Sequence, residues 1–122
     1  MSGRHQQLVR LIRDETAESF RAAFAYDEET WTALYVRSDL ATADLESVVP
    51  LLADRARTRK PLVREEDYGA LGTHRASISL HDDAVLIQFH GEGQSGVVVT
   101  LDTDVAQNLA EFVNRCESVL AE

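Results

Sequence analysis

The chain has almost no lysine, almost no cysteine and no long apolar run. Lys60 is its single lysine and Cys116 its single cysteine, so no disulfide can form within the chain, and nothing points to an oxidising compartment. The longest apolar stretches have the length of a strand, which is too short to span a membrane. The charged residues near the N-terminus argue against a signal peptide. The sequence therefore predicts a soluble cytoplasmic protein.

Positive charge is scarce as well. The 12 Lys and Arg side chains stand against 21 Asp and Glu, which gives a formal net charge of -9 over 122 residues. Nucleic acids and anionic membranes need clustered positive charge on a partner, so the charge balance argues against both. At roughly 1 M salt the Debye length is about 3 Å, and the self-repulsion of such a chain is largely screened. The composition thus predicts a protein of a salt-rich environment.

Apolar periodicity predicts eight elements in a single domain that spans residues 1–122. Helical spacing predicts helices over 5–19, 42–56 and from 104 to the C-terminus. Alternation predicts strands over 21–26, 31–37, 74–81, 84–91 and 96–101. The resulting fold class is α+β, with the order αββαβββα and an antiparallel five-stranded sheet that carries helices on one or both faces.

The clearest signal is a hairpin around the turn Asp82-Asp83. With that turn, Leu80 faces Val85, Ile78 faces Ile87 and Ala76 faces Phe89, and all six side chains share one face, which we expect to be the core face. The opposite face, with Ser77 and Gln88, is expected to be polar, although Leu86 and Val98 there favour cover by the second helix. The last helix is expected to bury one stripe, formed by Val105, Leu109, Phe112, Val113, Cys116 and Leu120.

The predicted helix over 42–56 has a start signal and an internal breaker. Thr42 is a suitable N-cap. Pro50 lies inside the apolar repeat and lacks a backbone donor, so we expect a kink or a restart there. Leu45, Val49 and Leu52 keep helical spacing and form part of its apolar face.

No motif supports catalysis. Residues 91–96 spell GxGxxG, but a dinucleotide fingerprint needs a helix next, and a valine-rich strand follows here. The hairpin places His81 and His90 at opposite ends, too far apart for one metal ion. Cys116, on an apolar helical stripe, is expected to be a small hydrophobe. The sequence therefore predicts no catalytic residue, no cofactor and no metal, and a protein that is not an enzyme.

A basic segment runs against the acidic composition. Five of the 12 basic side chains lie within ten positions, at Arg55, Arg57, Arg59, Lys60 and Arg64. They could stabilise a helix C-terminus or pair with the acidic residues that follow. They could also form a docking patch for an acidic partner or a phosphate. We take the docking patch as the candidate interaction site, together with the apolar residues Leu45, Val49 and Leu52.

The order αββαβββα resembles that of the Roadblock family, which has a profilin-like α+β fold. The resemblance covers nearly the whole chain as topology and implies a domain that dimerises and acts as an adaptor, often for small GTPases. The acidic composition and the stretch 97–102 resemble small haloarchaeal proteins, which implies no activity. The predicted function is a non-enzymatic adaptor of a halophilic cytoplasm that binds a protein partner or itself as a homodimer. The alternative is a small-ligand or nucleotide sensor that uses the 91–96 loop with Arg57, Arg59 or Lys60.

Overall fold

The structure is a computed structural model that describes residues 3–58, 62–64 and 66–121. Along the chain the helices and strands are α1 (Gly3–Thr16), β1 (Phe20–Tyr26), β2 (Trp31–Val36), α2 (Ala43–Thr58), β3 (Ala76–Leu80), β4 (Ala84–His90), β5 (Gly96–Asp102) and α3 (Gln107–Leu120). The predicted α+β class and the order αββαβββα are both confirmed.

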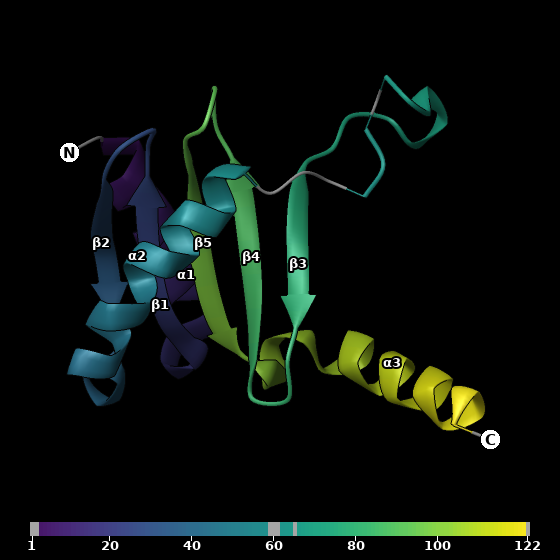
Figure 1. The fold of residues 1–122 in the computed structure, drawn as a ribbon. Coiled ribbons are helices and arrows are strands. Elements are labelled where there is room, and N and C mark those ends of the chain that lie inside the picture. The colour runs from purple at the N-terminus through teal and green to yellow at the C-terminus, as the bar shows by residue number, and fades with distance from the viewer. Residues whose placement is uncertain (1–2, 59–61, 65, 122) are drawn as a thin grey trace.

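All five strands form one antiparallel sheet in the order β2-β1-β5-β4-β3 (Figure 1). Three of the four pairings join strands that follow each other in sequence. The fourth pairs β5 with β1, and thus joins two strands that lie far apart in the sequence. Strands β2 and β3 are consequently the two edges.

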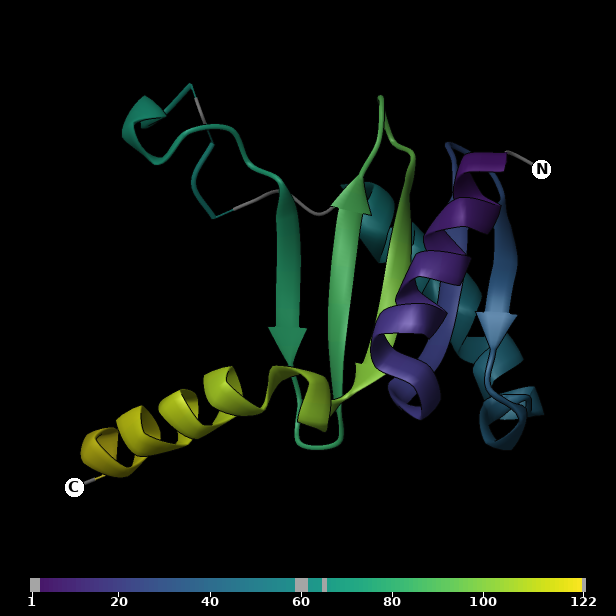
Figure 2. The same ribbon diagram turned by 180° about the vertical axis from the view of Figure 1, so that it is seen from behind.

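Helices α2 and α1 cover opposite faces of the sheet (Figures 1 and 2). Under α2 lies a buried cluster of six residues: Phe24, Tyr26, Val49, Ala53, Ala56 and Val98. Under α1 lies a second cluster of five: Phe20, Ala23, Val97, Val99 and Leu101. Strand β5 is therefore buried on both sides, which explains its unbroken valine run.

The hairpin register predicted around Asp82-Asp83 is confirmed, because Ile78 pairs with Ile87 and Leu80 with Val85. The expected cover of that face is only partly present. Val85 is buried, but Ile78 is 54% exposed. In Figure 2, no described helix lies over β3 on this side, since α1 lies over the other half of the sheet. In a single chain Ile78 is therefore not a core residue, so that prediction is wrong.

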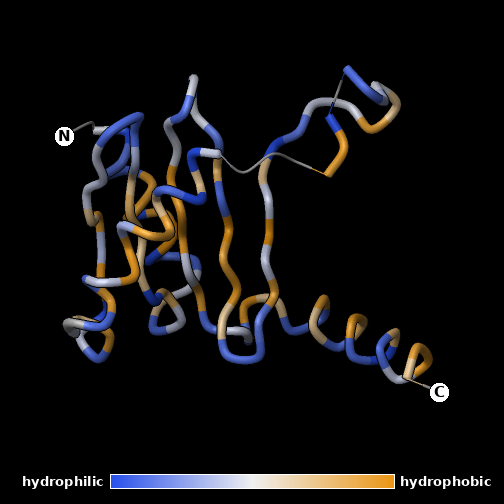
Figure 3. Tube along the Cα trace, viewed as in Figure 1, coloured by the Kyte–Doolittle hydropathy of each residue, from blue (hydrophilic) through white to orange (hydrophobic). Residues whose placement is uncertain are grey.

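The largest departure from expectation is the position of α3. This helix begins beside the β3–β4 turn and runs outward past the edge strand β3 (Figures 1 and 2). Its apolar stripe was predicted to pack in the core, yet Phe112 is 59% exposed and Leu120 is 81% exposed. Cys116 is exposed too. Figure 3 shows the alternation of apolar and polar residues along a helix that has left the sheet.

Helix α2 runs from Ala43 to Thr58 as one element with Pro50 inside it. Of the two alternatives predicted at Pro50, the restart is therefore wrong, and the kink stays a prediction. The predicted cap is confirmed, because the Leu45 backbone N–H donates to Thr42 Oγ1 at 3.4 Å. The outer-face residues Leu86 and Val98 do meet α2, as expected. Among the described helices, none is long and apolar enough to cross a membrane.

Candidate functional site

One side chain of the predicted basic segment, Arg57, is already engaged within the fold. Arg57 donates from Nε to the Asp27 carbonyl oxygen at 2.6 Å and from Nη2 to the Thr30 carbonyl oxygen at 3.0 Å. Its Nη1 forms an ion pair with Asp54 at 2.6 Å, and only 12% of the side chain is exposed. Arg57 therefore fastens the C-terminal end of α2 to the β1–β2 turn, and it has little surface left for a partner.

The turn that receives Arg57 is itself closed by Asp27. The carboxylate of Asp27 accepts hydrogen bonds from the backbone N–H groups of Thr30 at 2.8 Å and Glu29 at 3.0 Å. It also accepts from the Thr30 hydroxyl at 3.0 Å. These bonds, led by the one from the Thr30 backbone, hold the pKa of Asp27 below its ordinary value. Arg57 thus meets a turn whose carbonyl groups are fixed in place.

The remaining basic residues do not form one patch. Arg64 pairs with Glu66 at 3.1 Å and with Asp67 at 3.2 Å, as expected for charges near in sequence. Arg59 and Lys60 lie outside the described residues. Arg55 is exposed and borders a groove that Ser77, Ser79 and His81 also line. Of the described basic side chains in this segment, Arg55 is the one best placed to meet a partner.

The apolar part of the predicted site faces the sheet. Val49 is only 7% exposed, and Leu45 and Leu52 pack partly buried against the same cluster. These three residues stabilise the fold, so placing them at an interface needs correction. The exposed apolar side chains of α2 are Val48 and Leu51. The helical spacing could have shown this, because Val48 and Leu51 lie to one side of the stripe that points inward.

A buried glutamine anchors the same end of α2. Gln88, on β4, is 4% exposed, and its Nε2 donates to the Ala56 carbonyl oxygen at 2.8 Å and to the Tyr26 hydroxyl at 2.9 Å. Carbonyl groups in the last turn of a helix have no partner within the helix, so Gln88 supplies one. The alternating pattern had placed Gln88 on a polar outer face. The apolar residues Leu86 and Val98 on the same face had indicated cover by α2, but not that Gln88 would be buried beneath it.

The 91–96 loop joins β4 to β5, and its glycines serve the fold. Gly93 has a φ of 61°, in the left-handed region that favours glycine. A Cβ on Gly96 would lie 2.5 Å from the Tyr26 hydroxyl oxygen and against the Phe89 carbonyl oxygen. Strand β5 follows, where a dinucleotide site needs a helix. The loop nevertheless borders an open hollow of about 1140 Å³, which Arg4 and Trp31 also line.

The structure brings together two histidines that the sequence reasoning kept apart. The ring centroids of His74 and His90 are 4.8 Å from each other. Extending the β3–β4 register beyond Ala76 and Phe89 pairs His90 with Arg75 and His74 with Gly91, on opposite faces, so the strand pattern did not indicate this contact. No cluster of three or more His, Cys, Asp or Glu that could hold a metal ion occurs among the described residues.

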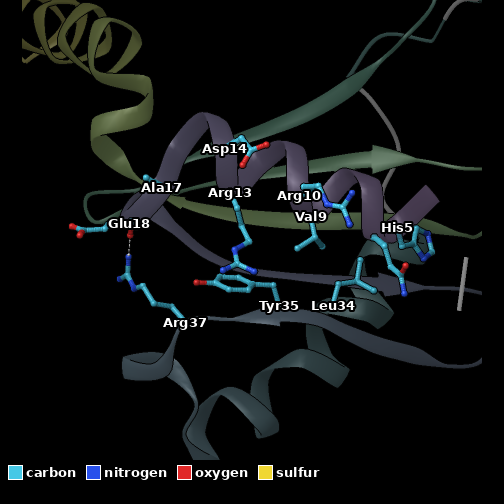
Figure 4. Close-up of a pocket in the computed structure, with 11 residues that line it drawn as sticks. His5, Val9, Arg10, Arg13, Asp14, Ala17, Glu18, Leu34, Tyr35 and Arg37 are labelled. Atoms are coloured by element: carbon cyan, nitrogen blue, oxygen red, sulfur yellow. Dashed lines mark hydrogen bonds between the residues drawn. The ribbon is translucent and has the colours of Figure 1, made fainter. Parts of the chain in front are cut away.

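A groove of about 760 Å³ lies between α1 and β2 (Figure 4). The Arg13 guanidinium lies 5.6 Å from the centre of the Tyr35 ring, which is a cation–π geometry. Arg37 at its end donates to Asp39, to Asp102 and to the Glu18 carbonyl oxygen. Asp39 and then Asp102 raise the pKa of Arg37, and hydrogen bonds from Arg37 lower the pKa of Asp102. Arg37 is thus a structural link between β2 and the end of β5.

The geometry defines a small α+β domain, with a five-stranded antiparallel sheet between two helices and a third helix projecting from it. The chain belongs to the DUF7522 family, described as a domain of unknown function, whose model matches residues 6–121. The match runs from α1 to the end of α3, so the family is defined by the whole αββαβββα chain. No curated protein matches the chain.

Proposed function

We propose that the protein is a non-enzymatic interaction module, an adaptor that works as a homodimer in a halophilic cytoplasm. The observation that carries the proposal is the apolar surface that one chain leaves exposed on the projecting helix α3, where Leu109, Phe112 and Leu120 all face solvent. Contiguous apolar side chains on a soluble domain are typical of surfaces that bind another protein.

Charge and topology give two further supports. Two copies that each carry a net charge of -9 repel each other at low ionic strength, and molar salt screens that repulsion. Apolar contacts persist under those conditions, so an association through α3 suits a salt-rich cytoplasm. The resemblance of the element order to the Roadblock family also implies dimerisation and an adaptor role.

The oligomeric state tests the proposal directly. Light scattering after size exclusion, in about 0.1 M and about 2 M KCl, should give the mass of two chains in the higher salt. The lower salt should shift the protein toward the mass of one chain, because repulsion is then less screened. A mass of one chain at every concentration in molar KCl would count against a homodimer.

The adaptor surface is proposed on the outer side of α2, at Arg55, Val48 and Leu51. With a purified partner, Arg55→Glu should slow the association of the two proteins, because charges at the rim of an interface act mainly on the rate of encounter. Arg10→Glu is the matched control, the reversal of an exposed arginine on α1, which covers the opposite face of the sheet. Reversal of Arg57 is unsuitable as a test because it would break the clasp to the β1–β2 turn. Equal effects of the two reversals would remove Arg55 from the site.

A ligand-sensing role for the 91–96 loop is the alternative function, favoured by the open hollow beside it. Arg57, one of its predicted partners, is engaged elsewhere. Thermal-shift measurements with ATP and NAD test this function. A shift that is lost in Gly93→Val, at unchanged melting temperature of the unliganded variant, would favour the sensor over the adaptor.

A further inference from the structure

Two apolar surfaces are left without cover by the residues that the structure describes in one chain. The first lies on the α1 side of the sheet and contains Ile78 and Phe89, both exposed, with half-buried Ile87 between them on β4. Leu11 adds to it, because it follows Leu8 by one helical turn on the flank of α1 that is away from Arg13 and Tyr35. Together these side chains form what we call the β3–β4 face.

The second surface is the stripe of α3. Its exposed apolar members repeat at helical spacing and are Leu109, Phe112, Cys116, Val119 and Leu120. The polar side of the helix is satisfied within the helix itself, since Gln107 donates to Glu111 at 3.2 Å and Ser118 donates to the Asn114 carbonyl oxygen at 3.1 Å. The stripe alone is left to be covered.

Contacts at the start of α3 direct it away from its own sheet. Thr103 donates to the Asp82 carbonyl oxygen at 3.0 Å, which fixes the chain to the β3–β4 turn. Ser19 donates to both carboxylate oxygens of Asp104, at 2.9 and 3.0 Å, which fixes it to the end of α1. From this anchored start, α3 runs beyond the edge strand β3 (Figures 1 and 2). The stripe of α3 is therefore not covered by the sheet of its own chain.

We propose that two copies of this chain exchange α3, so that the stripe of each helix covers the β3–β4 face of the other copy. The proposal rests on the homodimer proposed above and specifies its contact surface. A second copy is the occupant that fits, because every chain carries one stripe and one face. A two-fold arrangement covers both sets and leaves no open end for further copies. An unrelated partner would cover one surface and leave the other exposed.

The sizes of the two surfaces agree. A helix of 14 residues is about 21 Å long and about 10 Å wide. Strand β4 has 7 residues and spans about 24 Å, so the helix and the face have similar lengths. Two such dockings cover four surfaces, on the order of 1,000 Å² in total, which reaches the area that specific interfaces need.

The native thiol provides a test on the full-length protein. Cys116 lies on the stripe and is the only cysteine, so Ile78→Cys places a second thiol on the β3–β4 face. One copy with Ile78→Cys and Cys116→Ser is mixed with a differently tagged wild-type copy in molar KCl and treated with a short bismaleimide. We expect a cross-linked species that contains both tags. Phe112→Glu in the wild-type copy should abolish it, whereas Asn114→Glu, on the polar side of α3, should not.

Light scattering gives the second measurement. Phe112→Glu should weaken dimerisation by on the order of 10- to 100-fold, and Asn114→Glu should leave it within about twofold. If Ile78→Cys with native Cys116 cross-links within one chain, α3 folds back on its own sheet and the exchange is refuted. A dimer that shows no mixed cross-link and tolerates Phe112→Glu also refutes the exchange but keeps the homodimer. A protein of one-chain mass in wild type refutes both.

Discussion

Replacing Gln88 by alanine should destabilise the fold far more than its place on an alternating strand suggests. The side chain lies between the sheet and the last turn of α2 and is 4% exposed. It donates to the Tyr26 hydroxyl and the Ala56 carbonyl oxygen, and both of those residues are buried as well. Removing the Gln88 side chain therefore takes away the donor to both of these buried oxygen atoms.

The magnitude follows from these contacts. Each buried acceptor left without its donor costs about 1–3 kcal/mol. The lost packing volume adds to this, so we expect Gln88→Ala to lower the free energy of unfolding by about 2–4 kcal/mol. For a domain of 122 residues, a change of 1 kcal/mol shifts the melting temperature by roughly 3–6 °C.

Urea unfolding followed by circular dichroism measures the change. The matched control is Gln107→Ala, an exposed glutamine on α3 whose hydrogen bond to Glu111 is at the surface; it should cost less than about 0.5 kcal/mol. Tyr26→Phe completes a double-mutant cycle and should show coupling to Gln88. If Gln88→Ala is as stable as Gln107→Ala, then α2 does not cover β4 as the structure describes.

Three further predictions concern charge. Arg57→Ala should lower the free energy of unfolding by about 1–3 kcal/mol in the same urea assay. Arg57→Lys should not restore stability, because one ammonium group cannot reproduce the contacts of the guanidinium with two carbonyl groups and Asp54. Equal stability of the lysine variant and the wild type would contradict the role of Arg57 in holding α2 to the β1–β2 turn. Arg37 and Arg21 lower the pKa of Asp102 in the folded state, so the stability that Asp102 contributes is complete above its ordinary pKa of 3.8 and is lost as the pH falls through the folded pKa. Asp102→Asn should therefore reduce the loss of stability that wild type shows below about pH 4. An unchanged dependence of stability on acid pH would show that other carboxylates dominate. The melting temperature should rise between about 0.1 M and 2 M KCl as repulsion is screened; no change would count against the halophilic interpretation.

The sequence alone determined the local parts of the fold. Alternation and turn chemistry around Asp82-Asp83 fixed the β3–β4 register residue by residue, because a shift by one position would reverse both faces. The apolar repeat and Thr42 located α2. The stripe of α3 was also correct as a pattern. The net charge is also known from the sequence alone, and the class of partner inferred from it stays a prediction.

Only the tertiary structure decided which surfaces are covered. Periodicity shows that α3 has an apolar side but not what lies against it. The path of α3 depends on the contact of Ser19 with Asp104, 85 positions apart, and of Thr103 with Asp82, 21 positions apart. Arg57 could be a docking charge or a clasp until the β1–β2 turn is placed beside it. Gln88 became a buried anchor for the same reason: burial depends on long-range packing, which a local pattern does not specify.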